Sequence, residues 1–256
     1  MKYEEINGVK LAVEEKGKGS MAPLVFVHGW TADMHRWDDQ FEFFSKTRRV
    51  IRFDLRGHGE SEKCTSDMTI QQLSDDLYAL LKKLKVKKAV IAGHSMGGMT
   101  AQRFTLDHPE MVERLVLVDT TSKMIYAPSV KAQMTAAMIV PFKTFVKINI
   151  TRAFKKTYPA DNLKEMIAIS QKTPKNVVMP FFKAMMDFDV LSEVPAIQAK
   201  TLIVHGLYDI QLPLHQAVRT GCAIPNAVMK IIDSGHELPL EEPKKLTAAM
   251  AEFLKS

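Results

Sequence analysis

The stretch Ala89-Val-Ile-Ala-Gly-His-Ser-Met-Gly-Gly-Met-Thr-Ala-Gln102 decides the fold, because a run of small and β-branched apolar residues gives way within it to helix-forming residues. At the junction, Gly93-His-Ser-Met-Gly97 has the pattern Gly-x-Ser-x-Gly. A serine held on a sharp turn between a buried strand and a helix requires small neighbours, so that strand and helix can pass closely while the hydroxyl stands clear. The pattern favours a serine nucleophile at Ser95, the alternative being an ordinary serine-glycine turn.

Short apolar runs rich in Val, Ile and Leu recur on both sides of this stretch and predict strands buried between layers of helices. They cover residues 23–28, 49–54, 88–93, 113–119, 201–206 and 227–233. Amphipathic segments of helical length lie between most of them, at residues 35–45, 69–84, 95–108, 213–222 and 242–255. Strands that alternate with helices predict an α/β fold with a mostly parallel sheet and right-handed crossovers.

The N-terminal residues predict a different pairing. Residues 3–6 and 9–15 are joined by Asn7-Gly8, which is a strong signal for a tight hairpin. An antiparallel pair is therefore expected to open an eight-stranded sheet that has helices on both faces. Ligands of such sheets bind beyond the carboxyl ends of the parallel strands, so residues that directly follow each apolar run are candidate site residues.

The gap between Asp119 and Thr201 is too long for a structureless loop. It holds 7 of the 16 methionines and 6 of the 13 phenylalanines, and we expect a helical cap at approximately residues 121–195, inserted after strand 6 into a single domain spanning 1–256. These side chains could face a substrate or simply attach the cap to the body. Helical spacing joins Val130, Met134, Ala137, Met138 and Phe142, while Pro128, Pro141, Pro159, Pro174 and Pro180 are expected to divide the cap into short helices.

The charge distribution bears on possible partners. The chain has a net charge of +6, and residues 121–195 hold 11 Lys and Arg against 5 Asp and Glu, so they carry the whole excess. Because these cations form no arginine-rich stripe, we expect no nucleic-acid partner.

Location and redox state follow from two further features. The first ten residues hold four charged side chains and lack the apolar run of a secretory signal, and no later apolar run is long enough to span a membrane. These features predict a cytoplasmic protein without stable membrane insertion. Cys64 and Cys222 lie far apart and match no metal-ligand spacing, so free thiols and no metal site are expected. The oligomeric state stays open.

Four further motifs stand around the Gly-x-Ser-x-Gly pattern. They are VHGW at 27–30, DLRGHGES at 54–61, HGLYD at 205–209 and SGHELPLEEP at 234–243. Together and in this order, they make the sequence resemble the serine hydrolases of the α/β-hydrolase superfamily over essentially its whole length. The resemblance implies the α/β-hydrolase fold and a reaction that needs neither metal nor organic cofactor.

A serine hydroxyl needs a base to accept its proton and an acid to orient that base. His236 follows the last apolar run and precedes the final helix, which matches the position of the catalytic base in the resembling family. Asp209 follows the preceding run and is the favoured acid, while Asp119 is its rival because it also ends a strand. The other seven histidines, which are expected to be structural or helical, are His28, His35, His58, His94, His108, His205 and His215.

Two further assignments complete the expected site. The negative oxygen of a tetrahedral intermediate needs preset donors, and the resemblance assigns the backbone N–H groups of Trp30 and Met96. Asp54 is expected to brace its turn together with Arg56 rather than to act in catalysis.

These residues predict a serine carboxylesterase that hydrolyses esters of short to medium acyl chain through an acyl-enzyme. Ser95 argues against the related dehalogenases and epoxide hydrolases, which attack with an aspartate at this position. A lactone hydrolase similar to 3-oxoadipate enol-lactonase is the alternative, because residues 28–40 resemble that subgroup. Thioesterase and perhydrolase activities use the same site, and a non-catalytic small-molecule receptor on this scaffold is an alternative of another class. The expected partner is a small ester or lactone.

Overall fold

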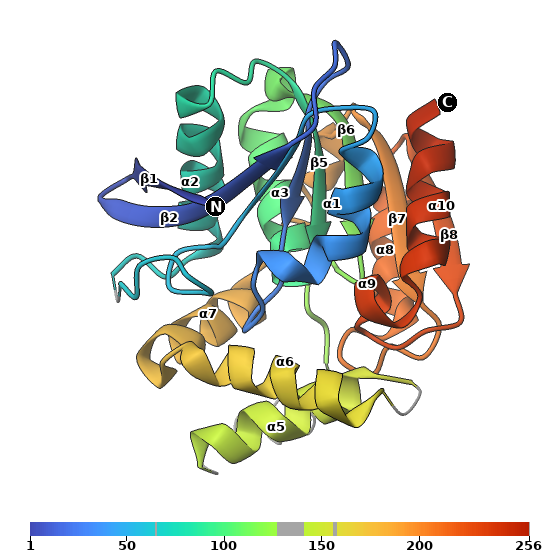
Figure 1. Cartoon of the computed structure of the whole chain (residues 1–256). Helices are drawn as coiled ribbons and strands as arrows, with labels where there is room; N and C mark the ends of the chain where they lie inside the picture. The colour runs from blue at the N-terminus through green and yellow to red at the C-terminus, as the bar shows by residue number, and fades with distance from the viewer. Residues whose placement is uncertain (65, 127–140, 156–157, 256) are drawn as a thin grey trace.

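The structure is a computed structural model that describes residues 1–64, 66–126, 141–155 and 158–255. Eight strands form one sheet in the order β1-β2-β4-β3-β5-β6-β7-β8 (Figure 1). The strands are β1 (Lys2–Ile6), β2 (Val9–Lys16), β3 (Leu24–Val27), β4 (Val50–Phe53), β5 (Ala89–His94), β6 (Val112–Val118), β7 (Lys200–Gly206) and β8 (Ala227–Ile232).

The pairing confirms the predicted mostly parallel sheet. The hairpin of β1 and β2 turns at Asn7 and Gly8, whose φ angles of 47° and 77° are the positive values that this tight turn requires. Strand β2 pairs antiparallel with β4, and every pairing from β4 to β8 is parallel. The carboxyl ends of the parallel strands therefore meet at one edge, as a shared site requires.

Helices cover both faces of the sheet. The described helices outside the β6–β7 connection are η1 (Met34–Trp37), α1 (Asp38–Phe44), α2 (Ile70–Lys83), α3 (Met96–Asp107), η2 (Pro109–Met111), α8 (Leu214–Ala223), α9 (Leu238–Glu241) and α10 (Pro243–Lys255), while the 3₁₀ turn η3 (Val194–Ala196) lies near the end of that connection. Helices α2, α3 and α8 contribute to one apolar layer and α1 and α10 to the other, the latter two lying in front of the sheet in Figure 1. Alternate strand residues such as Val25 and Phe26 point into opposite layers, as the pleat dictates.

Two predicted helices differ in detail. The segment predicted at 35–45 begins as the 3₁₀ turn η1, because the Asp33 side chain accepts from the His35 N–H and tightens its start, and continues as α1. The short helix α9 precedes the C-terminal helix α10 and was not expected from the sequence. Residues Leu238 and Pro239 at its start are buried, which places the chain after His236 against the body.

A helical insertion, defined as α5 (Phe142–Ala153), α6 (Ala160–Lys172) and α7 (Lys175–Asp187), connects β6 to β7. Figure 1 shows α5 and α6 beyond one edge of the sheet. The expected helical pattern at 130–138 and Pro128 lie outside the described residues.

The prolines of the helical insertion behave in two ways. Pro141, Pro159 and Pro174 each stand directly before a helix, as expected of a residue that cannot supply a helical N–H. Pro180 lies inside α7, so the prediction that it divides the helix is wrong. The helix continues because burial of Val177 and Phe181 in the core holds its apolar face in place despite the lost hydrogen bond.

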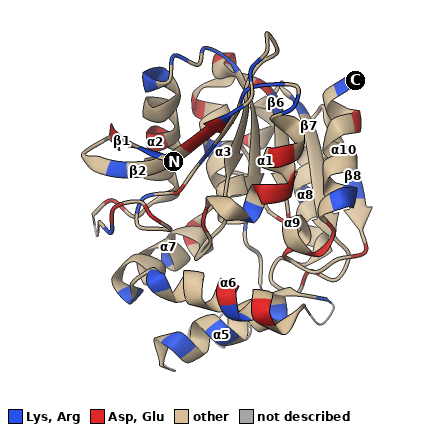
Figure 2. Cartoon of the chain, viewed as in Figure 1, with Lys and Arg blue, Asp and Glu red and all other residues tan. Residues whose placement is uncertain are grey.

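The surface of the helical insertion is partly basic. Helix α5 carries Lys143, Lys147 and Arg152 and no acidic residue (Figure 2). Among the described residues, no helix combines the length and apolarity that crossing a membrane demands.

Candidate active site

The turn between β5 and α3 presents Ser95 at the carboxyl edge of the sheet. Its backbone has φ 53° and ψ −118°, a conformation that is strained for a residue with a side chain. The Ser95 N–H donates to the Val118 carbonyl of β6 at 2.9 Å, and the Ser95 carbonyl accepts from the Thr120 hydroxyl at 2.8 Å. The strained turn is thus held by hydrogen bonds to the neighbouring strand and the loop that follows it.

Glycines allow the close approach that this turn requires. A Cβ atom on Gly97 would lie 2.3 Å from the Val27 carbonyl oxygen of β3. A Cβ atom on Gly93 would lie 2.2 Å from the Gly97 carbonyl oxygen. Both contacts are to backbone atoms, so no side-chain movement could relieve them.

Replacing Gly97 by alanine should therefore destabilise the protein. We expect a loss of about 3 kcal/mol in the free energy of unfolding, the upper end of typical overpacking costs, because β3 and α3 must separate. Gly221→Ala is the matched control, since its Cβ would meet only side-chain atoms, the nearest being the terminal Met229 methyl at 3.0 Å. Denaturant unfolding measures both variants, and equal stability of the two would contradict the close-approach argument.

The structure brings Ser95, His236 and Asp209 together. The Ser95 Oγ lies 3.0 Å from His236 Nε2, and His236 Nδ1 lies 2.7 Å from Asp209 Oδ2. Because a carboxylate only accepts, a neutral imidazole carries its proton on Nδ1 and donates it to Asp209. Nε2 is then the acceptor for the Ser95 hydroxyl.

The two rival acids occupy different places. Asp209 Oδ1 accepts from the backbone N–H groups of Gln211 and Leu212, both at 2.8 Å, which leaves Oδ2 for His236. Asp119 instead accepts from the N–H groups of Gly206 at 2.8 Å and Leu238 at 3.2 Å. Within the described part of the chain, no hydrogen bond joins Asp119 to His236, so Asp209 is the one of the two carboxylates that contacts the imidazole.

Burial and charge perturb the pKa values of these groups. Burial alone would lower the pKa of His236, but the adjacent Asp209 carboxylate raises it to about 9. Burial, together with the negative charge of Asp209, raises the pKa of Asp119 well above its usual range. The site therefore favours a strongly basic imidazole at His236.

The remaining motif residues support the loops. His94 lies 2.9 Å from the His236 carbonyl oxygen through its Nε2, and burial lowers the pKa of His94 to about 4, so the ring is neutral. Asp54 accepts from the Met34 and Glu60 N–H groups and so braces its turn as expected. Arg56, which was expected to share that task, instead forms a buried ion pair with Asp76 of α2.

One group of described residues has metal-ligating atoms close together. Atoms of Asp119, His205 and Asp209 lie within 4.8 Å of one another. Both carboxylates already accept backbone N–H groups, and His205 Nε2 donates to the Leu212 carbonyl at 2.8 Å. A cation bound here would compete with His236 for the Asp209 carboxylate. We therefore interpret the cluster as a hydrogen-bonded group that holds Asp209 in place rather than as a metal site.

The candidate oxyanion donors flank Ser95. Met96 begins α3 directly after it, and Trp30 follows Gly29, where an added Cβ would lie 3.2 Å from the Ser95 Cβ. Among the described residues, no acceptor takes a hydrogen bond from the backbone N–H of Trp30 or Met96. Both groups are therefore available to a negative oxygen near Ser95.

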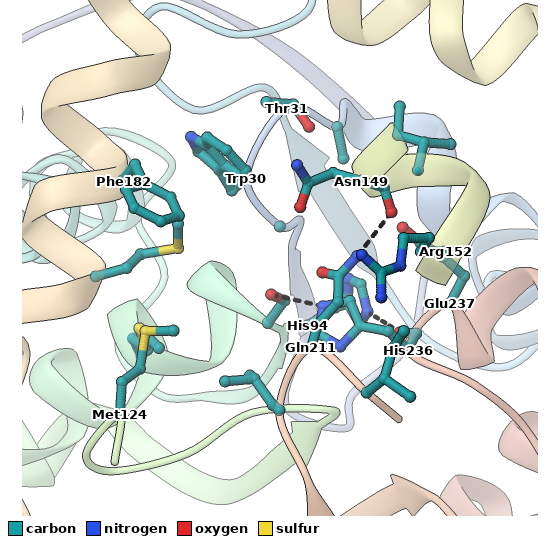
Figure 3. A pocket seen from close by; sticks show the side chains of 18 of the residues that line it. Trp30, Thr31, His94, Met124, Asn149, Arg152, Phe182, Gln211, His236 and Glu237 are labelled. Atoms are coloured by element: carbon teal, nitrogen blue, oxygen red, sulfur yellow. Dashed lines mark hydrogen bonds between the residues drawn. The ribbon is translucent and has the colours of Figure 1, made fainter. Parts of the chain in front are cut away.

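A cavity of about 400 Å³ opens above Ser95 and His236. Its lining includes apolar and polar side chains, and Figure 3 shows Phe182 and Met124 apart from Arg152, Gln211 and Glu237, with Asn149 beside Trp30. Phe145 and Met185 of the helical insertion also line it, whereas Phe181 is buried in the core and attaches α7 to the body.

The sequence reasoning missed the polar side of this cavity. Arg36 and Glu237 form an ion pair of 3.0 Å and are only 8% and 7% exposed. The sequence held a signal for both residues, because each lies beside a motif already singled out. Arg36 is in the segment after HGW, and Glu237 directly follows His236. Arg152 carries no local signal, because it is one of many cations between β6 and β7.

Comparisons with known proteins agree with this fold. A family described as alpha/beta hydrolase fold has a model that matches residues 22–243. The chain is 26% identical to 3-oxoadipate enol-lactonase 1 of Acinetobacter baylyi, over 97% of this chain and 94% of the relative. It resembles the solved enol-lactonase of Burkholderia xenovorans with a TM-score of 0.90 and 27% identity, covering 100% of both chains. A thermophilic esterase from Thermogutta terrifontis has a TM-score of 0.89 and 26% identity, with 100% of this chain and 98% of the other covered.

Proposed function

The chain belongs to the α/β-hydrolase family, and on that basis we propose that it is a serine hydrolase that cleaves carboxylic esters through an acyl-enzyme. The observation that carries the proposal is the hydrogen-bonded series from the Ser95 hydroxyl through His236 to Asp209. Its order and its position beside the cavity suit nucleophilic attack on a bound carbonyl carbon. We further propose that residues 1–256 form a single domain, with the helical insertion acting as its cap.

In the first half-reaction, His236 Nε2 accepts the Ser95 proton while Oγ attacks the ester carbonyl carbon. The resulting oxyanion accepts hydrogen bonds from the Trp30 and Met96 N–H groups, each of which contributes roughly 3 kcal/mol in comparable sites. His236 then gives its proton to the leaving alcohol oxygen as the carbon–oxygen bond breaks. Water, deprotonated by His236, hydrolyses the acyl-enzyme and restores Ser95.

The pH profile follows from the raised pKa of His236. The imidazole must be neutral to accept the serine proton, so activity is low below the pKa and rises as pH increases through it. With that pKa at about 9, we expect kcat/KM for a neutral ester to keep rising on the alkaline side of pH 7. Initial rates between pH 6 and 10 measure the profile, and a plateau reached below neutral pH would contradict the electrostatic argument.

A lactone hydrolase is the second candidate, favoured by the similarity to enol-lactonases in both sequence and structure. The same chemistry opens a lactone, because a lactone is a cyclic ester. Its leaving oxygen stays attached to the acyl group, so the ring opens and no separate alcohol is released. Aryl esters of increasing acyl length, compared with a carboxylate-bearing lactone, separate the two candidates. Preference for short to medium acyl esters supports the esterase, and a kcat/KM that is much larger for the lactone overturns it.

A receptor on this scaffold would behave differently. It could react once with a fluorophosphonate at Ser95, yet it would not turn over an ester. Labelling followed by steady-state hydrolysis therefore distinguishes the two classes, and labelling without turnover across the ester and lactone panel would overturn the proposed enzyme.

A further inference from the structure

The two sides of the cavity differ in chemistry. Trp30 packs against Phe145 and Phe182 with ring centroids 6.0 and 5.3 Å apart, and its indole N–H donates to the Val178 carbonyl of α7. The indole N–H is thereby satisfied, so this side offers an apolar surface. We call it the apolar side, defined by Trp30, Phe145 and Phe182 together with Met124 and Met185.

The polar side, defined by Arg36, Asn149, Arg152, Gln211 and Glu237, combines residues of η1 and α5 with one residue from each of the loops that carry Asp209 and His236. The Gln211 side-chain amide donates to the Asn149 carbonyl of α5 at 3.0 Å. The next turn of α5 ends at Ala153, whose carbonyl accepts from the His236 backbone N–H at 2.7 Å. These bonds hold the C-terminal end of α5, including Arg152, beside the imidazole (Figure 3).

The polar side carries a net positive charge. Glu237 is paired with Arg36. Although burial alone would raise the pKa of Glu237, the Arg36 guanidinium keeps that pKa below its usual range, so the pair as a whole is neutral. Arg152 is exposed at the cavity wall, and no residue that the structure describes forms an ion pair or side-chain hydrogen bond with its guanidinium.

The reaction assigns a substrate group to each side. In the tetrahedral intermediate the oxyanion points to the Trp30 and Met96 N–H groups, and the leaving oxygen must reach His236 Nε2 to receive its proton. The alcohol part therefore lies on the His236 side, which is the polar side. The acyl part takes the remaining direction, over the apolar side.

We propose that the substrate is an ester of an apolar acid with a hydroxy acid, and that Arg152 binds the carboxylate of the alcohol part. This inference rests on the proposed serine hydrolase function and adds which half of the substrate carries the charge. A guanidinium can hold a carboxylate through two parallel hydrogen bonds, which gives direction as well as attraction.

Three esters test the position of the charge. The butyrate ester of 4-hydroxybenzoate carries a carboxylate on the alcohol part, and the butyrate ester of 4-hydroxybenzamide is its neutral counterpart. Phenyl hydrogen glutarate carries the carboxylate on the acyl part instead. The readout is the ratio of kcat/KM for each charged ester to kcat/KM for the neutral amide ester. The same ratio is compared between the wild type and each variant, so that differences in leaving-group reactivity cancel.

For Arg152→Gln we expect the 4-hydroxybenzoate ratio to fall about fivefold. This loss is larger than that expected from losing a solvent-screened surface ion pair and smaller than that from losing a strong charge-assisted hydrogen bond. Arg152→Glu should lower it further, and added salt should weaken the wild-type preference. The matched control is Lys147→Gln, which removes an exposed cation of α5 that does not line the cavity and should leave the ratio unchanged. The glutarate ratio should change less than the 4-hydroxybenzoate ratio in every variant.

The outcomes separate this inference from the function on which it rests. Ser95-dependent hydrolysis of the amide ester, with a 4-hydroxybenzoate ratio that Arg152→Gln does not change, overturns the inference and leaves the serine hydrolase in place. A larger loss for the glutarate ester also overturns it, because the charge would then belong to the acyl part. If the wild-type protein hydrolyses none of the three esters and forms no acyl-enzyme with them, ester hydrolysis and the inference both fail.

Discussion

Replacing Ser95 by alanine should abolish ester turnover, with kcat falling by roughly 10⁶-fold toward the background left by binding and oxyanion stabilisation alone. The change removes the only atom that forms the acyl bond in the proposed mechanism. It also leaves the neighbours of the turn in place, because the hydrogen bonds that hold Ser95 use its backbone N–H and carbonyl groups. Folding should therefore be preserved.

Two measurements check this prediction. Steady-state hydrolysis of a butyrate aryl ester gives the loss in kcat, and intact-protein mass spectrometry after rapid acid quenching detects the acyl adduct in the wild type and its absence in the variant. Thermal unfolding shows that Ser95→Ala is folded. Turnover near the wild-type level in the folded variant would remove Ser95 from the mechanism.

Replacing Asp209 by asparagine should lower kcat by roughly 10⁴-fold, the size found when the acid of such a triad becomes an amide. The amide NH₂ would donate to Nδ1 and force the proton onto Nε2, so the imidazole could no longer accept the Ser95 proton. The same change removes the charge that raises the pKa of His236. The midpoint of the residual pH profile should therefore move to lower pH.

Asp119→Asn is the matched control for the choice of acid. Asp119 accepts from Gly206 and Leu238 but has no described hydrogen bond to His236, so its loss should act mainly through stability. We expect a folded Asp119→Asn variant to keep far more activity than Asp209→Asn. The reverse order of activities, measured at matched folded fractions, would make Asp119 the acid.

Much of the architecture could be predicted from local patterns. The six apolar runs and the Asn7-Gly8 turn predicted eight strands, and all eight are present. These predictions succeeded because the spacing of apolar residues and the conformation of a tight turn depend on residues that are near one another in the chain. The prediction for Pro180 was wrong because packing of α7 against the core, a distant interaction, outweighs the local cost of a proline.

The candidate site likewise has features that local patterns predict and features that depend on distant packing. The motif positions singled out Ser95, Asp209 and His236 and left Asp119 as a rival, while the roles of these residues in catalysis stay predictions that the variants test. The choice between the acids depends on which carboxylate reaches His236 Nδ1, and that is set by how the loops after β6, β7 and β8 pack. No pattern within a single segment contains that information.

By itself, the sequence determined the alternation of strands and helices and the sharp turn at Ser95, because short-range sterics and hydrophobic periodicity act within a few residues. Only the tertiary structure decided that Asp209 contacts the imidazole, that Arg36 and Glu237 pair in the cavity wall, and that Arg152 stands on the His236 side. Those placements join residues far apart in the chain. Their distances are fixed by the packing of the whole sheet and its loops rather than by any local preference.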